Sequence, residues 1–330
     1  MINPHRDPSW TCPPAPAEIR DFHRSLPGYS PTRLVELPEL AARTGVGRLF
    51  AKDESSRLGL PAFKALGASW AIHRALRDVT GGPVTIVTAT DGNHGRAVAH
   101  FARRFGQRAE IYVPDGVHPA AIQAIRDEGA AVIHVPGPYD AAVEAAAGAR
   151  RGLLIQDTAW DGYEETPARI VDGYSTLFAE IDEQLPVPAD MVLVPAGVGS
   201  LLQAALAHYR SRPDPAATRV VSVEPSVAAC VSASVAAGRP VTVATGPTRM
   251  AGLNCGTVSS LAWPYIHRGL DLCLTVTDAE VSGAARALAA HGVDAGPCGA
   301  APLAALNLLA PAGATVVLLV TEGTAANPAG

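Results

Sequence analysis

Short apolar runs alternate with alanine-rich segments along most of the chain, from about residue 84 onward. Because the runs are rich in β-branched residues and do not alternate with polar ones, they predict strands that are buried on both faces, as in parallel sheets. The predicted strands are 84–90, 110–114, 131–136, 153–158, 191–196, 219–225, 272–277 and 315–321.

The segments between these runs carry apolar residues at helical spacing. The predicted helices are 94–104, 119–128, 140–150, 167–184, 200–209, 225–237, 278–291 and 299–309. Repetition of strand, helix and strand predicts an α/β protein with two open, largely parallel, twisted sheets flanked by helices.

A long helical stretch at 165–186 separates two sets of these units. It predicts a smaller domain, 67–170, inserted into a larger domain made of 1–66 and 171–330. The proline-rich first 31 residues show no clear periodicity, so we expect an ordered arm that runs over the surface or over a partner.

Composition restricts the partners of the chain. With 48% apolar residues the chain can bury a large core, whereas 17% charged residues and a net charge of −5 provide no basic surface for nucleic acid or an anionic membrane. So few charges suggest a partly covered surface, and we expect a homodimer.

Neither a membrane-spanning run nor a secretory leader is evident, which predicts a cytoplasmic protein. The five cysteines lie too far apart for a zinc pair, so no metal site is expected.

Only two of the 26 basic residues are lysines, Lys52 and Lys64. An amine can lose its proton and attack a carbonyl group, which a guanidinium cannot do. Either lysine is therefore a candidate nucleophile, although both could also be ordinary structural residues. Lys64 stands at the start of a predicted helix among apolar residues, where burial and the helix end are expected to lower the pKa of its amine.

Glycines mark the turn AGVGSL, 196–201, between a predicted strand and a helix. Its backbone amides and the helix N-terminus could form a phosphate cradle. A dinucleotide fingerprint is the alternative, with Glu224 as the ribose-binding acid, but Leu202 stands where a third glycine is required. A plain structural turn is a third possibility.

Two further strand ends carry polar side chains, in TATDGNHGR (88–96) and in QDTAWDGY (156–163). The first places Asp91, Asn93 and His94 on one turn, and the second includes Asp157 and Asp161. Ligands of open α/β sheets bind at the carboxyl ends of strands, so these loops are candidate site segments. Helix capping and a solvated acidic loop are the simpler explanations.

Together these motifs resemble those of the fold-type II pyridoxal 5'-phosphate enzymes, the family of tryptophan synthase β, threonine dehydratase and serine racemase. The resemblance implies that Lys64 in AFKALGA forms the Schiff base with the cofactor and that Asn93 binds the ring hydroxyl. Thr321 in VTEG is implied as the partner of the pyridine nitrogen. The implied phosphate loop consists of Gly197, Val198, Gly199 and Ser200.

Within that family the chain is most similar to the diaminopropionate ammonia-lyases, on the basis of TATDGNHGR, QDTAWDGY, MAGLNCG (250–256) and the terminal TEG. The resemblance implies β-elimination from 2,3-diaminopropionate to pyruvate and ammonia, through an aminoacrylate. Asp91 and Asp157 are implied as acid and base groups beside Lys64. For an L-substrate Lys64 can remove the α-proton, and Asp91 is the candidate base for the opposite face.

One stretch departs from the family. Where relatives carry Glu-Ser-Gly-Ala, this chain has PCGA, 297–300, so one carboxylate is missing. Cys230 and Cys255 match lyase cysteines and could lie near each other, although two reduced thiols are expected in the cytosol. The alternatives are a dehydratase of serine, threonine or hydroxyaspartate, a β-replacement synthase, a cofactor-stabilised binding protein and, remotely, a nicotinamide-dependent oxidoreductase.

Overall fold

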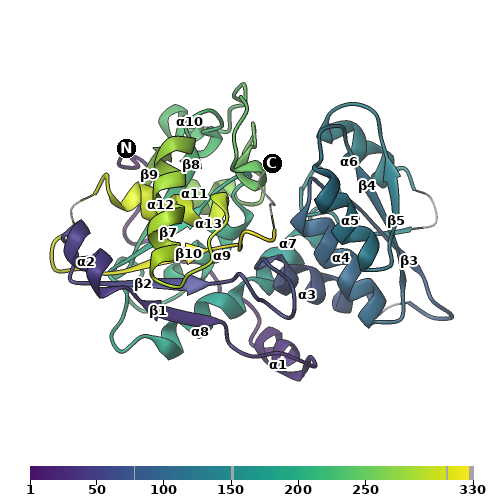
Figure 1. Cartoon of the computed structure of the whole chain (residues 1–330), viewed down its shortest axis with the longest axis horizontal. Helices are drawn as coiled ribbons and strands as arrows, with labels where there is room; N and C mark the ends of the chain where they lie inside the picture. The colour runs from purple at the N-terminus through teal and green to yellow at the C-terminus, as the bar shows by residue number, and fades with distance from the viewer. Residues whose placement is uncertain (78, 150–151, 310, 327–330) are drawn as a thin grey trace.

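The computed structural model describes residues 1–77, 79–149, 152–309 and 311–326, and it contains two separate sheets (Figure 1). In the larger sheet every neighbouring pair is parallel except β1 and β2. Its order is β1 (Arg33–Glu36), β2 (Arg48–Asp53), β10 (Thr315–Val320), β7 (Met191–Pro195), β8 (Arg219–Pro225) and β9 (Leu272–Val276).

The smaller sheet is wholly parallel. Its order is β5 (Ala131–His134), β4 (Arg108–Val113), β3 (Thr85–Ala89) and β6 (Gly152–Leu154). Both sheets are covered on both faces, as the unbroken apolar runs require. The helices α9 (Ser200–Arg210) and α13 (Pro297–Leu306) pack on opposite faces of the larger sheet, and α4 (Asn93–Arg104) and α6 (Tyr139–Ala147) do so on the smaller one.

The remaining helices surround these two layers. They are α1 (Glu18–Ser25), α2 (Pro38–Thr44), α3 (Lys64–Leu76), α5 (Pro119–Asp127), α7 (Glu165–Gly173), α8 (Ser175–Gln184), α10 (Cys230–Ala237), a 3-10 turn η1 (Ala251–Leu253), α11 (Trp263–Gly269) and α12 (Asp278–Ala290).

The predicted fold class is confirmed, and all eight predicted strands are present within a few residues. The division into domains with the boundaries 67 and 170 stays a prediction. The strands β1 and β2 were not predicted, and the N-terminal segment, which was expected to form an ordered arm, contains the helix α1. The predicted helix 167–184 is two helices that meet at Tyr174, and the helix predicted from 225 begins only at Cys230. Arg150, the predicted end of one helix, and residues 327–330 of the predicted large domain lie outside the described residues.

Two glycines allow α3 and α7 to pack closely at the junction between the two sheets. A Cβ atom on Gly67 would lie 2.6 Å from the Tyr174 ring, and one on Gly173 would lie 2.7 Å from the Leu66 carbonyl oxygen. Distances this short exclude a side chain at either position. Since α3 begins with Lys64, this contact helps to fix where that lysine stands.

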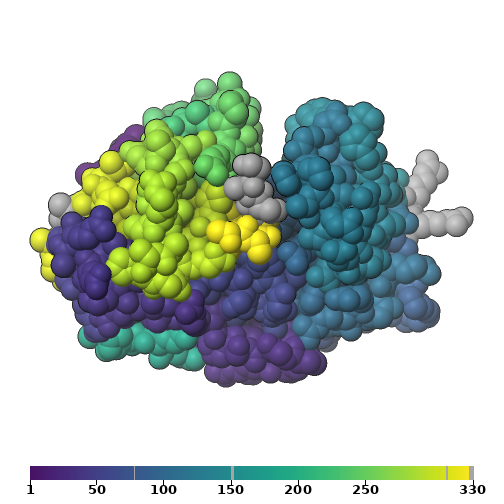
Figure 2. Space-filling model, viewed as in Figure 1, coloured from purple at the N-terminus to yellow at the C-terminus, as the bar shows by residue number. Residues whose placement is uncertain are grey.

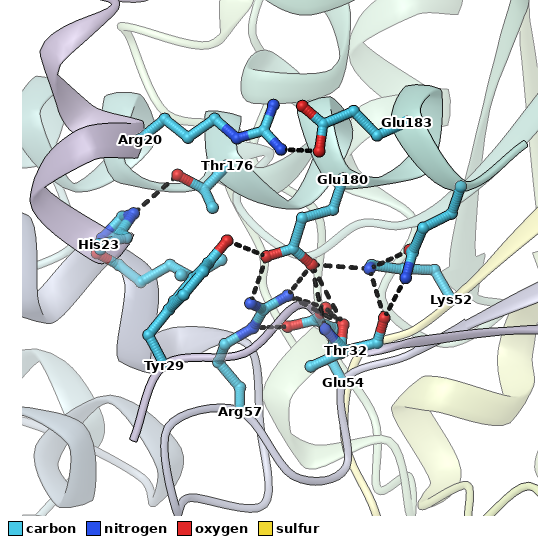
Figure 3. A network of polar contacts seen from close by, with 12 residues as sticks. Arg20, His23, Tyr29, Thr32, Lys52, Glu54, Arg57, Thr176, Glu180 and Glu183 are labelled. Carbon is cyan, nitrogen blue, oxygen red and sulfur yellow. Dashed lines mark hydrogen bonds and ion pairs between the residues drawn. The ribbon is translucent and has the colours of Figure 1, made fainter. Parts of the chain in front are cut away.

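A buried network of charged groups joins the loop before α3 to α8 and to the N-terminal segment (Figure 3). Arg57 donates hydrogen bonds to Glu54 and Glu180, and all three side chains are inaccessible to solvent. Lys52 is part of the same network. Its Nζ donates to Glu180 Oε2 at 2.7 Å, to the Thr32 carbonyl at 2.8 Å and to Gln184 Oε1 at 2.8 Å. These acceptors use all three protons of the ammonium, so Lys52 is a structural residue.

Candidate active site

A cavity of about 200 Å³ lies between the two sheets, at the carboxyl ends of their strands. The two parts of the molecule are separated by a groove in the space-filling view (Figure 2). All nine residues that the family resemblance implies for catalysis or cofactor binding line this cavity: Lys64, Asp91, Asn93, Asp157, Gly197, Val198, Gly199, Ser200 and Thr321. Five segments far apart in the sequence therefore meet at one place.

The glycine loop leads from β7 into the N-terminus of α9. Gly199 has a φ of +99°, and a Cβ atom there would lie 2.9 Å from Ile266 Cδ1; one on Gly197 would lie 2.9 Å from Cys255 Sγ. Only glycine fits at positions 197 and 199 of this loop. The loop thus brings its backbone to the cavity at the positive end of a helix, which suits a phosphate group.

Cys230 and Cys255 flank the same loop. The Cys230 thiol donates to the Gly197 carbonyl oxygen at 3.5 Å, and both cysteines are free thiols. Burial raises the pKa of Cys255 to about 12 and also raises that of Cys230.

Lys64 is the first residue of α3, and its Nζ donates a hydrogen bond of 2.8 Å to Asp157 Oδ2. Burial alone would lower the pKa of this amine, but the negative charge of Asp157 outweighs burial and raises it. The expectation of a lowered pKa was therefore wrong. It rested on the local surroundings of Lys64 and did not include a carboxylate 93 positions away in the sequence.

Asp157 follows β6 and is held from two sides. Its Oδ2 accepts from Lys64, and its Oδ1 accepts from Gln156 Nε2 at 3.2 Å. Burial tends to raise the pKa of this carboxyl group, but His94 and Lys64 together lower it to about 2. Asp157 is therefore an anion throughout the physiological range.

Asp91 lies on the loop between β3 and α4. Its side chain is exposed to solvent in the cavity, while protein atoms enclose it on the other sides. Desolvation by that enclosure, followed by the charge of Asp157, raises the pKa of Asp91. The two carboxyl groups of the cavity thus differ: one is fixed as an anion, and the other can exchange a proton more readily.

Asn93 and Thr321 stand deeper in the cavity. Asn93 Nδ2 donates to Glu322 Oε2 at 2.7 Å, and Thr321 directly follows β10. Glu322 Oε1 also accepts from the backbone N–H of Cys298, at 3.3 Å, at the start of α13. The PCGA stretch (297–300) therefore lies against the Glu322 carboxylate, which lies just beyond the end of β10.

The sequence analysis missed several residues of the cavity. Among them are Tyr139, Tyr174, Asn254 and Glu322. Tyr139 begins a helix and Tyr174 lies between two helices. A search for polar residues at the carboxyl ends of strands therefore does not find them. Conversely, Asp161 and Glu224 are not among the lining residues; Glu224 instead accepts hydrogen bonds from the backbone N–H groups of Val231 and Ser232 in α10.

These features fit pyridoxal 5'-phosphate. The glycine loop at the N-terminus of α9 would hold the phosphate, the Lys64 amine reaches the cavity for an imine bond to the aldehyde, and Asn93 and Thr321 supply polar groups for the ring. Within the described residues no cluster of His, Cys, Asp and Glu could hold a metal ion, and no helix is long and apolar enough to cross a membrane.

Comparison with known proteins agrees with this fit. The family model "Pyridoxal-phosphate dependent enzyme" matches residues 26–322. The diaminopropionate ammonia-lyase of Salmonella typhimurium is 37% identical over 307 residues, which cover 82% of this chain and 76% of that protein. An L-threonine dehydratase of Mycobacterium leprae is 28% identical over 313 residues, covering 91% and 70%.

The fold is also that of a solved relative. The structure of Escherichia coli diaminopropionate ammonia-lyase in complex with an aminoacrylate-PLP azomethine reaction intermediate superposes with a TM-score of 0.90 at 32% identity, covering 98% of this chain and 93% of that one. A nicotinamide-dependent oxidoreductase is thereby excluded, and the cofactor is pyridoxal 5'-phosphate. The chain belongs to the pyridoxal-phosphate dependent enzymes of fold type II.

Proposed function

We propose that this protein is an ammonia-lyase that converts 2,3-diaminopropionate and water into pyruvate and two molecules of ammonia. The observation that carries the proposal is the pair of carboxylates, Asp91 and Asp157, that share one cavity with the Lys64 amine. A substrate with a second amino group on Cβ brings an extra positive charge, which such a cavity favours. The similarity to diaminopropionate ammonia-lyases supports the same substrate.

Bound pyridoxal phosphate draws electrons from the α-carbon of the amino acid attached to it. The chain's own residues then move the protons. We assign removal of the α-proton to Lys64 for the L-enantiomer and to Asp91 for the D-enantiomer. The raised pKa of Asp91 makes it a stronger base than an ordinary carboxylate, which suits that task.

We assign the β-amino group of the substrate to Asp157. Because the pKa of Asp157 is lowered to about 2, this carboxylate remains charged and can hold a β-ammonium group. In the cofactor-free protein the Lys64 ammonium occupies this place, with Nζ 2.8 Å from Asp157 Oδ2. Departure of the β-nitrogen as neutral ammonia is then helped by a group that keeps it protonated until the bond breaks.

Dehydration of serine, threonine or hydroxyaspartate is the second candidate. It is favoured by the similarity to threonine dehydratase and by the missing carboxylate in PCGA. A hydroxyl substrate has no need of two carboxylates, however, and both Asp91 and Asp157 would be left without a cationic partner on it. β-Replacement uses the same residues and differs in the presence of a second nucleophile.

The stoichiometry of the products separates these functions. Protein loaded with pyridoxal phosphate is incubated with L- and D-2,3-diaminopropionate, L-serine and L-threonine, and oxo acid and ammonia are measured. We expect two ammonia per pyruvate from both enantiomers of diaminopropionate, and no product with Lys64→Ala. A higher kcat/KM for serine or threonine than for diaminopropionate would instead assign the protein to the dehydratases.

A homodimer in the cytoplasm is part of the same proposal. The low fraction of charged residues favours a surface that is partly covered by a second copy. Five free cysteines, three of them buried, suit a reducing compartment. Sedimentation of the purified protein measures the oligomeric state directly.

A further inference from the structure

His94 is a buried histidine whose tautomer follows from one contact. Its side chain is 3% exposed, and Nε2 lies 2.8 Å from the carbonyl oxygen of Ile155. Because a carbonyl oxygen only accepts hydrogen bonds, Nε2 must carry a hydrogen. In the neutral ring Nδ1 is then a bare acceptor, and among the described residues it has no hydrogen-bond partner.

The bare nitrogen faces a carboxylate. Nδ1 of His94 lies 3.8 Å from Asp157 Oδ2, the same oxygen that accepts the 2.8 Å hydrogen bond from Lys64 Nζ. Two acceptors that face each other in a buried site leave room for a proton between them. Asp157 Oδ2 thus stands between a group that carries a proton and a group that can accept one.

Lys64 has to lose a proton before its nitrogen can bond to an aldehyde carbon, since an ammonium has no lone pair. We propose that Asp157 and His94 take up this proton: it passes from Lys64 Nζ to Asp157 Oδ2, and from there to His94 Nδ1 when these two atoms close from 3.8 Å to hydrogen-bond distance. The proposal rests on the cofactor role of Lys64 and not on the identity of the amino-acid substrate. His94 is then a positioning residue that acts on Lys64 through Asp157.

The charges balance in this transfer. At the start Lys64 is +1, Asp157 is −1 and His94 is neutral; at the end Lys64 is a neutral amine with its lone pair, Asp157 is again −1 and His94 is +1. The positive charge moves from Lys64, on one side of the Asp157 carboxylate, to His94 on the other side. The net charge of the site is unchanged. Asp157 remains an anion at both ends, in agreement with its lowered pKa.

Electrostatics couples the two ends of this path. Burial lowers the pKa of His94, the charge of Asp157 raises it, and the cation on Lys64 lowers it. When the Lys64 charge is removed, one of the two effects that lower the pKa of His94 disappears, so His94 accepts a proton more readily. His94 also stands in the first turn of α4, where the helix dipole disfavours a cation and makes Asp157 its necessary partner.

The coupling can be measured without substrate. Titration of the histidine imidazoles by NMR compares the full-length, cofactor-free protein with its Lys64→Met variant. We expect the His94 resonance to titrate at a higher pH in Lys64→Met. His100, on the same helix and bonded to Glu128 at 3.0 Å, serves as the internal control and is expected to titrate as before. An unchanged His94 titration in Lys64→Met would overturn the proposal.

A second measurement follows the covalent capture of the cofactor. In His94→Gln the amide can still donate to Ile155, but nothing replaces Nδ1. We expect the absorbance change on mixing cofactor-free protein with pyridoxal phosphate to be about 10²-fold slower at pH 7, the lower end of the usual contribution of a general base, with its pH profile displaced to higher pH. A rate and profile equal to those of the native protein would contradict the proposal. Because neither experiment uses diaminopropionate, their outcome is independent of the proposed lyase activity.

Discussion

We propose Asp91 as the residue whose loss affects the two enantiomers of the proposed substrate differently. If Asp91 is the base for the D-enantiomer, Asp91→Asn should lower kcat/KM for D-diaminopropionate by about 10²- to 10⁴-fold, the usual contribution of a general base. For the L-enantiomer the decrease should be much smaller, because Lys64 remains. Pyruvate formation with each enantiomer measures both values.

The control for this variant is Asp161→Asn, because the Asp161 side chain does not line the cavity. It should leave both enantiomers unaffected. Equal losses for the two enantiomers in Asp91→Asn would show that Asp91 has another task. The activity of the native protein on the D-enantiomer should also decline on acidification at a higher pH than an ordinary carboxylate would cause, because the raised pKa of Asp91 protonates the base earlier.

Individual residues also show which parts of the site a sequence can predict. Lys64, Asn93 and Gly199 stand in motifs whose local spacing is itself informative, and all line the cavity. The electrostatic state of Lys64 depends on Asp157, which tertiary structure brings to 2.8 Å. Neither this charge nor the orientation of His94 toward Asp157 is encoded in any local pattern.

At the scale of single elements, the glycine loop before α9 carries a direct prediction. Gly199→Ala combines a positive φ of 99° with a Cβ atom 2.9 Å from Ile266 Cδ1. We expect the Kd for pyridoxal phosphate to rise at least about tenfold, since displacement of the loop and backbone strain each cost about 1 kcal/mol or more. Fluorescence or absorbance titration of cofactor-free protein measures the Kd.

Gly162→Ala is the matched control. Gly162 has a similar φ of +82°, but a Cβ atom there meets nothing within 4 Å. Its backbone cost is comparable, whereas cofactor affinity should stay near the native value. If both variants lose the same affinity, general backbone strain and not the shape of the phosphate loop is responsible.

Helix α1 carries a pH-dependent prediction through His23. The buried His23 donates from Nε2 to the Leu66 carbonyl at 3.0 Å and accepts from Thr176 Oγ1 at 2.7 Å, so it joins α1 to α3 and α8. Burial, the largest effect, lowers its pKa to about 3. The folded protein therefore keeps His23 neutral, while the unfolded chain gains a proton as the pH falls below 6.5.

The contribution of neutral His23 to the free energy of unfolding is thus fully present above pH 6.5 and declines as the pH falls toward 3. Between pH 6.5 and 5.5 the free energy of unfolding should decrease by about 1 kcal/mol more in the native protein than in His23→Gln. Thr176→Val keeps the imidazole and should keep the native slope at a lower overall stability. Urea unfolding at the two pH values tests this, and equal slopes for native protein and His23→Gln would contradict it.

At the scale of the whole molecule, the network around Arg57 connects three regions of the chain (Figure 3). Arg57→Met leaves Glu54 and Glu180 buried without their guanidinium partner. We expect the free energy of unfolding to fall by about 3 to 5 kcal/mol, as in other broken buried ion pairs. Arg169→Met, which breaks a pair with the exposed Glu165, should cost less than about 1 kcal/mol. Similar losses in the two variants would show that the network contributes no more than a surface pair.

The arrangement of the whole molecule follows from the sequence only in part. Short, unbroken, β-branched runs such as 191–196 and 315–321 favour strands covered on both faces, and they form β7 and β10. The short strands β1 and β2 contain several charged residues, and their partners are distant in the sequence: Lys52 donates to Glu180 in the buried network, and Asp53 accepts from Arg33 across the two strands. At the break between α7 and α8 the Tyr174 ring packs closely against Gly67, a tertiary contact that periodicity alone does not reveal.

The visible absorption spectrum of the purified protein, before and after addition of L- and D-2,3-diaminopropionate, tests the central claim most directly. We expect a yellow band from pyridoxal phosphate bonded to Lys64, which changes with either enantiomer while pyruvate accumulates; Lys64→Ala should lack both the band and the product. A band that responds to neither enantiomer, with no pyruvate formed, would contradict the proposed lyase activity.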